Sequence, residues 1–259
     1  ETAFFGADLA NDRRLSLDQY LAVFAGAGDA VRVGEVSTTY LASRTAASEI
    51  HELNPETRII IPLRDPITVM HAIHNLMVWT GFEPIHDFTA ALEAQERERT
   101  QQDTHARRGL LPPYREIVDY AEHVGRYFDT FGRDRVHVML FDDWVADTPT
   151  EYRKTLEFLE VDPSFLPVPG VVNPNRQVRR PRLHDFLVGR ATRAVPARAR
   201  PRARNMLIKL TTQEARREPL DADLHESLRI ELAPGIERLA KLIDRDLSAW
   251  TAEPQRVSS

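Results

Sequence analysis

Apolar residues in this chain recur mainly at the three- and four-residue spacings of amphipathic helices. Two short runs, residues 59–63 and 135–141, break that period and are rich in strand-forming residues, so they predict β-strands. Local signals mark the segment ends, such as a capping serine at Ser16 and a helix break at Gly132. We expect helices over residues 16–24, 40–53, 66–81, 88–106, 113–131, 148–159 and 224–244.

The first strand runs directly into an arginine and a helix start. Residues 59–63 are followed by Arg64, and Asp65 and Pro66 form an N-cap with proline at the first helical position. The first turn of a helix presents backbone N–H groups and the positive end of the dipole, and a neighbouring arginine adds a planar charge. The junction therefore predicts a phosphate or sulfate site. The alternative is an arginine that pairs with a carboxylate at a helix start.

The alternation of strands and helices predicts the fold class. It indicates an α/β protein of three layers, with a mostly parallel central sheet flanked by helices. The 259 residues, 42% of them hydrophobic, are enough for one large core, so we expect a single domain over residues 1–259. Ligands of such folds bind at the carboxyl ends of the strands, where Arg64 lies.

Composition narrows the partners and the compartment. A formal net charge of -5 is mild for this length and favours neither wholesale nucleic-acid binding nor membrane attraction. The absence of cysteine excludes disulfides and thiolate metal sites. No apolar segment approaches the roughly 20 residues that span a bilayer, and no signal peptide is visible, so we expect a cytoplasmic protein without a transmembrane segment. Only Lys154, Lys209 and Lys241 among the 34 basic residues are lysine, a bias typical of GC-rich bacterial genomes.

Six segments follow one another at spacings that match a known protein family. They are residues 1–5 (Glu-Thr-Ala-Phe-Phe), 34–41 (Gly-Glu-Val-Ser-Thr-Thr-Tyr-Leu), 59–66, 133–144, 155–161 and 239–250. Together they resemble the sulfotransferases that use 3'-phosphoadenosine 5'-phosphosulfate (PAPS), with the bacterial and Golgi carbohydrate branch closest. The resemblance implies a sulfotransferase fold similar to that of the P-loop nucleotide hydrolases.

The resemblance assigns the arginine junction to the cofactor. It implies that Arg64 contacts the 3'-phosphate of PAPS, in agreement with the anion site expected from the residues alone. The family usually supplies a serine to the same phosphate eight residues later, and this position is Ala72. His71 and Asn75 are candidates to replace that hydroxyl, and the sequence favours neither.

Glu1 matches the glutamate that similar carbohydrate sulfotransferases use as general base. A partly buried carboxylate suits the removal of a proton from the acceptor hydroxyl as its oxygen attacks sulfur. An exposed glutamate without a catalytic role is the alternative. Glu35, in the second matching segment, is expected to be structural, with a role in orienting substrate or pairing Arg64 as the alternative.

A strongly basic stretch follows the second predicted strand and its helix. Residues 176–204 contain ten arginines and one acidic residue, Asp185. By the resemblance, Asn173, Arg176 and Arg179 lie where the family covers its cofactor, so we expect Arg176 and Arg179 to bind PAPS, with a solvated basic loop as the alternative. The part from Arg190 to Arg204 is expected to form a lid or a surface for anionic substrate. Contact with nucleic acid or an anionic membrane is the less favoured interpretation, because interleaved aromatic residues and a known binding motif are absent.

Two residue clusters suggest metal binding only weakly. His71 and His74 lie three residues apart without an apparent third ligand, and Asp142 and Asp143 follow a strand as magnesium ligands often do. Sulfuryl transfer needs no metal, so we expect none and regard these residues as structural.

The family's phosphosulfate-binding loop, Lys-x-Gly-Thr-Thr, does not occur in the sequence. The glycine-bearing segment 25–29 lacks its lysine and hydroxyls and is interpreted as a turn. We expect the loop upstream of Glu1 in a longer protein, and a truncated, non-catalytic binding protein that retains only the 3'-phosphate half-site is the alternative. The expected activity is transfer of a sulfuryl group from PAPS to the hydroxyl of a carbohydrate, lipid or natural product, with a small molecule or glycan rather than nucleic acid as partner.

Overall fold

The computed structural model describes residues 2–9, 14–100, 112–165, 176–190, 196, 198–215 and 219–253. The chain divides into two compact units. The first comprises Glu1–Pro66, Arg108–Pro169 and Glu231–Ser259, and the second comprises Ile67–Arg107 and Gly170–Ile230. Two helices, α3 (Pro66–Thr80) and α11 (Ala222–Ile243), contribute residues to both units. A single domain over residues 1–259 stays a prediction.

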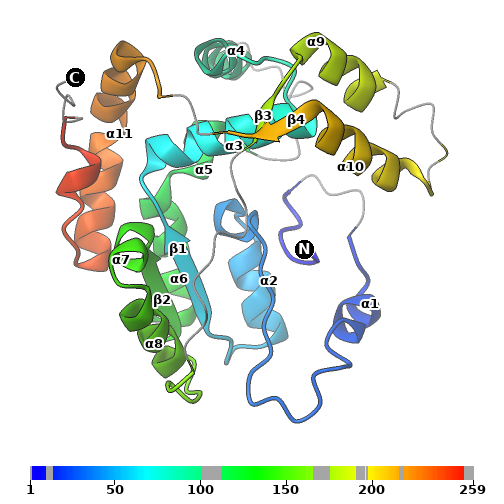
Figure 1. Cartoon of the computed structure of the whole chain (residues 1–259). Helices are drawn as coiled ribbons and strands as arrows, with labels where there is room; N and C mark the ends of the chain where they lie inside the picture. The colour runs from blue at the N-terminus through cyan, green and yellow to red at the C-terminus, as the bar shows by residue number, and fades with distance from the viewer. Residues whose placement is uncertain are drawn as a thin grey trace. The chain divides into compact units, whose positions relative to one another are not determined.

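The first unit contains a two-stranded parallel sheet (Figure 1). Strands β1 (Ile59–Leu63) and β2 (Val136–Leu140) pair from Ile59 opposite Val136 to Leu63 opposite Leu140. Parallel strands end at the same edge of a sheet, so the residues that follow them lie close together. The other elements of this unit are α1 (Leu17–Ala22), η1 (Tyr40–Ala42), α2 (Ala46–Leu53), α5 (Tyr114–Ile117), α6 (Tyr120–Phe131), η2 (Arg133–Arg135), α7 (Phe141–Ala146), α8 (Thr148–Phe158) and η5 (Ser248–Trp250).

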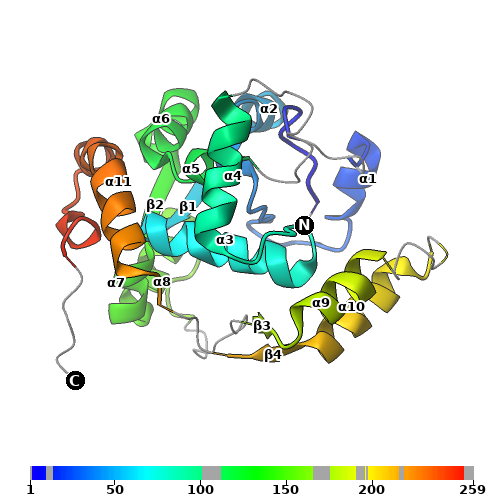
Figure 2. The ribbon, with the colours of Figure 1, turned by 90° about the horizontal axis from the view of Figure 1, so that it is seen from above.

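Alternate residues of β2 face opposite sides of this sheet. The ring of His137 stacks on Phe158 of α8 with the centroids 5.2 Å apart. Val136 and Val138 instead line a small cavity together with Phe128 of α6. Figure 2 shows α6 and α8 on opposite sides of the two strands. The α/β fold class with a helix-covered parallel sheet is therefore confirmed.

The starts of α1 and α8 can be compared with their capping signals, and that of α8 is shifted by one residue. Ser16 and Gln19 form a complete capping box at the start of α1. At α8, however, the N-cap is Asp147, whose carboxylate accepts a hydrogen bond from the backbone N–H of Thr150 at 3.1 Å. A carboxylate at this position also suits the positive end of the helix dipole. The helix therefore uses the acidic residue that precedes the expected Thr148 cap.

The second unit contains an antiparallel pair of short strands between helices. Its elements are most of α3, α4 (Phe88–Thr100), β3 (Arg176–Val178), α9 (Pro181–His184), the π-helix η3 (Asp185–Arg190), α10 (Arg200–Thr211), β4 (Thr212–Glu214) and the start of α11. Strands β3 and β4 pair from Arg176 opposite Glu214 to Val178 opposite Thr212. Figure 1 shows them joined to α9 and α10 respectively.

The turn after α3 is closely packed within the second unit. Gly81 adopts a positive φ of 76°, and a Cβ on it would lie 2.9 Å from Val188 of η3, so a larger residue would be strained. The guanidinium of Arg204 lies 4.1 Å from the ring centroid of Phe82 and donates to the carbonyl of Thr80. Helices α3, η3 and α10 are thus held together by a glycine turn and one arginine.

The structure divides two of the predicted helices, one of them at a buried site. The predicted helix over 113–131 is divided into α5 and α6 at Val118 and Asp119. Val118 and Tyr120 are both buried. Two residues apart on a continuous helix they would lie about 200° apart, so one helix would not bury both against the same layer. The predicted segment 40–53 is likewise divided into η1 and α2.

Residues 25–29 form a turn in which the N–H of Ala27 bonds to the carbonyl of Phe24 at 2.9 Å, as expected. Across the described ranges of the chain, none of the helices combines the length and the apolar character needed to cross a bilayer.

Candidate functional site

The end of β1 places Arg64 against an aromatic ring. Its guanidinium carbon lies 4.3 Å from the ring centroid of Phe141, the residue that follows β2. The parallel register explains this contact, because Leu63 lies opposite Leu140 and the next residues leave the sheet together. A cation held over an aromatic face is fixed in direction while its N–H groups stay available to an anion. Arg64 is half-buried, which suits a ligand-binding side chain.

A buried tyrosine lies close to the same junction. Tyr120 begins α6 and is buried close to Arg64 and Asp65. Burial, followed by the negative charge of Asp65, raises the pKa of the Tyr120 hydroxyl above its ordinary value, and Arg64 partly opposes this effect. Tyr120 therefore stays neutral. Its burial keeps the positive charge of Arg64 and the start of α3 beside a low-dielectric layer, where an anion is attracted more strongly than in water.

The first turn of α7 is fixed by contacts with Arg245 and Trp250. The indole N–H of Trp250 donates to Asp142 at 2.9 Å, and Arg245 pairs with Asp143. These carboxylates therefore hold α7, and with it Phe141, in place. The interpretation of Asp142 and Asp143 as structural agrees with these contacts.

Helix α3 begins at Pro66, two residues after Arg64. The expected serine position, Ala72, lies further along this helix and is half-exposed. Of its two candidate substitutes, His71 stacks on the ring of Phe88 with the centroids 5.3 Å apart. Asn75 donates from its side-chain Nδ2 to the carbonyl oxygen of Arg176 at 2.9 Å. Asn75 thus has a positioning role that the sequence did not reveal.

The two arginines predicted in the basic stretch lie at strand β3. The guanidinium of Arg176 is 3.5 Å from the hydroxyl of Thr212 on the partner strand. Arg179 is exposed, and its backbone N–H bonds to the carbonyl of Thr211 at 2.9 Å. Both belong to the second unit, whereas Arg64 belongs to the first. Asn173 lies outside the described residues.

The predicted base, Glu1, also lies outside the described residues, but the segment after it is tied down. The hydroxyl of Thr2 donates to Glu35, and the Tyr40 hydroxyl lies 3.1 Å from the Thr2 hydroxyl. The backbone N–H groups of Phe4 and Phe5 donate to the Tyr40 hydroxyl at 2.9 and 3.3 Å. Glu35 therefore organises the segment next to Glu1, in agreement with its expected structural role.

Aromatic packing reinforces this arrangement. The ring of Phe4 stacks on Tyr20 with the centroids 4.2 Å apart, and Phe5 meets Tyr40 edge to face. Burial and a hydrogen bond to Glu35 raise the pKa of the Tyr20 hydroxyl above its ordinary value. The hydroxyls of Thr2, Tyr20 and Tyr40 all form hydrogen bonds to the Glu35 carboxylate, that of Tyr40 at 3.3 Å.

Replacing Tyr40 with phenylalanine is expected to lower the free energy of unfolding by about 1–3 kcal/mol, because the Phe4 and Phe5 amides lose their acceptor. Urea denaturation measures this change. Tyr152→Phe on α8, which removes one hydroxyl elsewhere in the unit, is the control. Equal stability of the two variants would show that the Tyr40 hydroxyl does not hold the segment.

The buried histidine of α3 makes a structural contact. His74 bonds through Nε2 to the carbonyl of Ile85 at 2.9 Å, and burial lowers the pKa of its imidazole below the ordinary value. Within the ranges that the structure describes, no three histidine, aspartate or glutamate side chains gather where they could share a metal ion.

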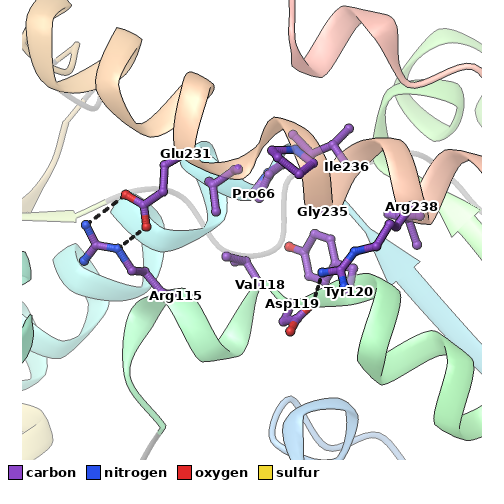
Figure 3. Close-up of a pocket in the computed structure, with 12 residues that line it drawn as sticks. Pro66, Arg115, Val118, Asp119, Tyr120, Glu231, Gly235, Ile236 and Arg238 are labelled. Carbon is purple, nitrogen blue, oxygen red and sulfur yellow. Dashed lines mark hydrogen bonds and ion pairs between the residues drawn. The ribbon is translucent and has the colours of Figure 1, made fainter. Parts of the chain in front are cut away.

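A pocket of about 250 Å³ lies beside Pro66, the first residue of α3 (Figure 3). Its apolar lining includes Pro66, Tyr120 and Ile236. Two ion pairs flank it: Arg115 with Glu231 at 2.5 Å and Arg238 with Asp119 at 3.7 Å. The lining does not include Arg64, Arg176 or Arg179, so the pocket is separate from the predicted anion site.

Comparison with known proteins supports the fold. Neither the known protein-family models nor the curated proteins include a match to this chain. Among solved structures, the chain is similar to a sulfotransferase from Alicyclobacillus acidocaldarius, with a TM-score of 0.67 and 26% sequence identity. The similarity covers 97% of this chain and 86% of that protein. The chain therefore has the mixed α/β fold of a sulfotransferase.

Proposed function

We propose that this protein is a sulfotransferase that moves a sulfuryl group from PAPS to an acceptor hydroxyl. The observation that carries the proposal is the strand-to-helix junction at Arg64, in a chain similar over nearly its full length to a bacterial sulfotransferase. A guanidinium fixed over Phe141 beside a helix start has the chemistry to bind a phosphate monoester. The 3'-phosphate of PAPS is such a group.

In the proposed reaction the acceptor oxygen attacks sulfur in line with the leaving group. A new oxygen–sulfur bond forms while the bond between sulfur and the bridging phosphate oxygen breaks, which leaves adenosine 3',5'-bisphosphate. The Glu1 carboxylate takes the proton of the hydroxyl. Its role rests on the resemblance of residues 1–5 to the catalytic segment, and the contacts of Thr2, Phe4 and Phe5 support a fixed position for that segment.

Arg176 and Arg179 are proposed as further ligands of the cofactor. Arg176 lies on the short strand β3, whose backbone the Asn75 side chain and β4 both hold, and the backbone N–H of Arg179 bonds to the carbonyl of Thr211. Because Ala72 has no hydroxyl to donate to the 3'-phosphate, the arginine side chains contribute a larger share of the binding energy of that phosphate. The acceptor is proposed to be a small molecule or glycan. The transfer of the sulfuryl group to it is proposed to need no metal ion.

Binding of adenosine 3',5'-bisphosphate tests the proposal directly. At a ligand concentration of 100 times Kd, binding stabilises the native state by about 2.7 kcal/mol. For a chain of this size each kcal/mol raises Tm by roughly 2–4 °C, so a shift of several degrees is expected in a thermal denaturation assay. Adenosine 5'-monophosphate, which lacks the 3'-phosphate, is the matched control.

An equal shift with both nucleotides, or none with either, would contradict the site at Arg64. A shift with the bisphosphate but no turnover of PAPS with any hydroxyl acceptor, in the natural full-length protein, would favour the non-catalytic binding protein instead.

A further inference from the structure

The second unit has a surface on which exposed basic and large apolar side chains lie together. From Arg176 to Lys209 the sequence has eleven basic residues and one acidic residue, Asp185, although the whole chain is acidic. Asp185 is already paired with His86 at 3.1 Å. Of these basic residues, Arg182 lies on α9, and Arg200, Arg202, Arg204 and Lys209 lie on α10.

Helix α10 shows this combination most clearly. Its inner face buries Ile208 and Thr211. On the opposite face Met206 is 60% exposed and Leu210 is 65% exposed, and these two residues are neighbours because they lie four positions apart. Exposed Arg202 and Lys209 belong to the same face by their helical spacing. One side of this helix thus packs in the core. The opposite side is exposed, although it carries large apolar as well as cationic side chains.

The neighbouring helix repeats the arrangement. His184 of α9 is fully buried and bonds through Nδ1 to the Thr211 hydroxyl of α10 at 2.7 Å, which fixes the two helices together. Leu183 is 44% exposed and Phe186 is 56% exposed. Phe186, in η3, lies four positions after the exposed Arg182 and three positions after Leu183, and residues three and four apart share a helix face. Two helices held by one buried contact therefore present the same combination of side chains.

We propose that this basic-apolar surface, formed by Arg182, Leu183, Phe186, Arg202, Met206, Lys209 and Leu210, docks on an anionic lipid bilayer. Such a bilayer supplies phosphate groups for the cationic side chains and an acyl boundary for the apolar ones, which is the pattern of interfacial amphipathic helices. The proposal goes beyond sulfuryl transfer and does not depend on it.

The positive charge and the exposed apolar side chains of this surface together favour a lipid bilayer over other anionic partners. A nucleic acid would satisfy the arginines but gives no account of exposed Met206 and Leu210, since its binders use aromatic stacking and hydrogen-bonding side chains. A water-exposed acidic substrate likewise gains nothing from these two residues. Long arginine and lysine stems can lie along apolar groups while their charged heads reach lipid phosphates.

Flotation with lipid vesicles tests the proposal on the whole chain. Vesicles of equal parts phosphatidylcholine and phosphatidylglycerol should carry the protein, and vesicles of phosphatidylcholine alone should not. Arg202→Gln and Lys209→Gln should each reduce the partition coefficient about fivefold, which corresponds to about 1 kcal/mol per charge near an anionic surface. Met206→Ser with Leu210→Ser should reduce it further at high salt, where electrostatic attraction is screened.

Matched controls separate docking from general stickiness. Ile230→Ser removes an equally exposed apolar residue outside the surface, and Arg153→Gln removes a charge from α8. Neither should change flotation. Circular dichroism confirms that each variant is folded. Binding to short RNA with the same affinity as to the vesicles, unaffected by the serine variants, would overturn the proposal, as would a folded chain that fails to float with anionic vesicles.

Discussion

Replacing Arg64 with alanine is expected to weaken the binding of adenosine 3',5'-bisphosphate by about 1.5–3 kcal/mol, or roughly 10- to 150-fold in Kd. The physical reason is the loss of a charge-assisted hydrogen bond from a guanidinium that Phe141 holds in place. Arg64→Lys should give an intermediate loss, because it retains the charge and lacks the planar fork. Isothermal titration calorimetry measures both variants.

Arg153→Ala provides the control for this prediction. Arg153 is an exposed arginine on α8, so its removal changes the net charge equally without touching the junction. Affinity should remain at the wild-type value. If Arg64→Ala and Arg153→Ala bind the bisphosphate equally well, the anion site lies elsewhere.

Replacing Glu1 with glutamine is expected to reduce kcat about 10²- to 10⁴-fold, the usual contribution of a general base. The substitution keeps the size of the side chain and removes its ability to accept the hydroxyl proton. Affinity for the bisphosphate should stay nearly unchanged, because Glu1 is proposed to act on the acceptor. Steady-state kinetics with PAPS, in the natural full-length protein, provide the measurement.

Glu52→Gln, an exposed carboxylate on α2, is the matched control and should keep full turnover. A pH profile adds a second readout, since loss of the base should remove the acidic limb of the kcat profile. Full activity of Glu1→Gln would move the base to another group. Glu35 would then be the next carboxylate to test, because it already accepts a hydrogen bond from Thr2.

The parallel sheet and its covering helices were predictable because their signals are local. Ile59–Leu63 is a short apolar run, and Asp65 and Pro66 mark the start of the helix that follows it. The antiparallel pair β3 and β4 was not predictable. Each strand has only three residues, without the apolar alternation of a strand, and their pairing joins Arg176 to Glu214 across a long stretch of chain.

The candidate site shows the same division. The strand end and helix start on either side of Arg64 could be predicted from the sequence, whereas the contact of Arg64 with Phe141 could not be predicted by local reasoning. The signal was present in principle, because two parallel strands that end together bring their next residues together. The roles of Tyr40 and Asn75 depend on contacts with Phe4 and Arg176, which are far from them in sequence and lie in segments that no periodicity describes.

The hydrogen bond between Trp250 and Asp142 joins two segments that the ribosome delivers far apart in time. The first unit is assembled from the beginning, the middle and the end of the sequence, so its packing stays incomplete during most of translation. Nascent chains with such distant contacts fold late and expose apolar surface meanwhile. The arginine junction is consequently among the last parts to mature, and chaperone occupancy on stalled nascent chains should persist until the segment around Trp250 has emerged.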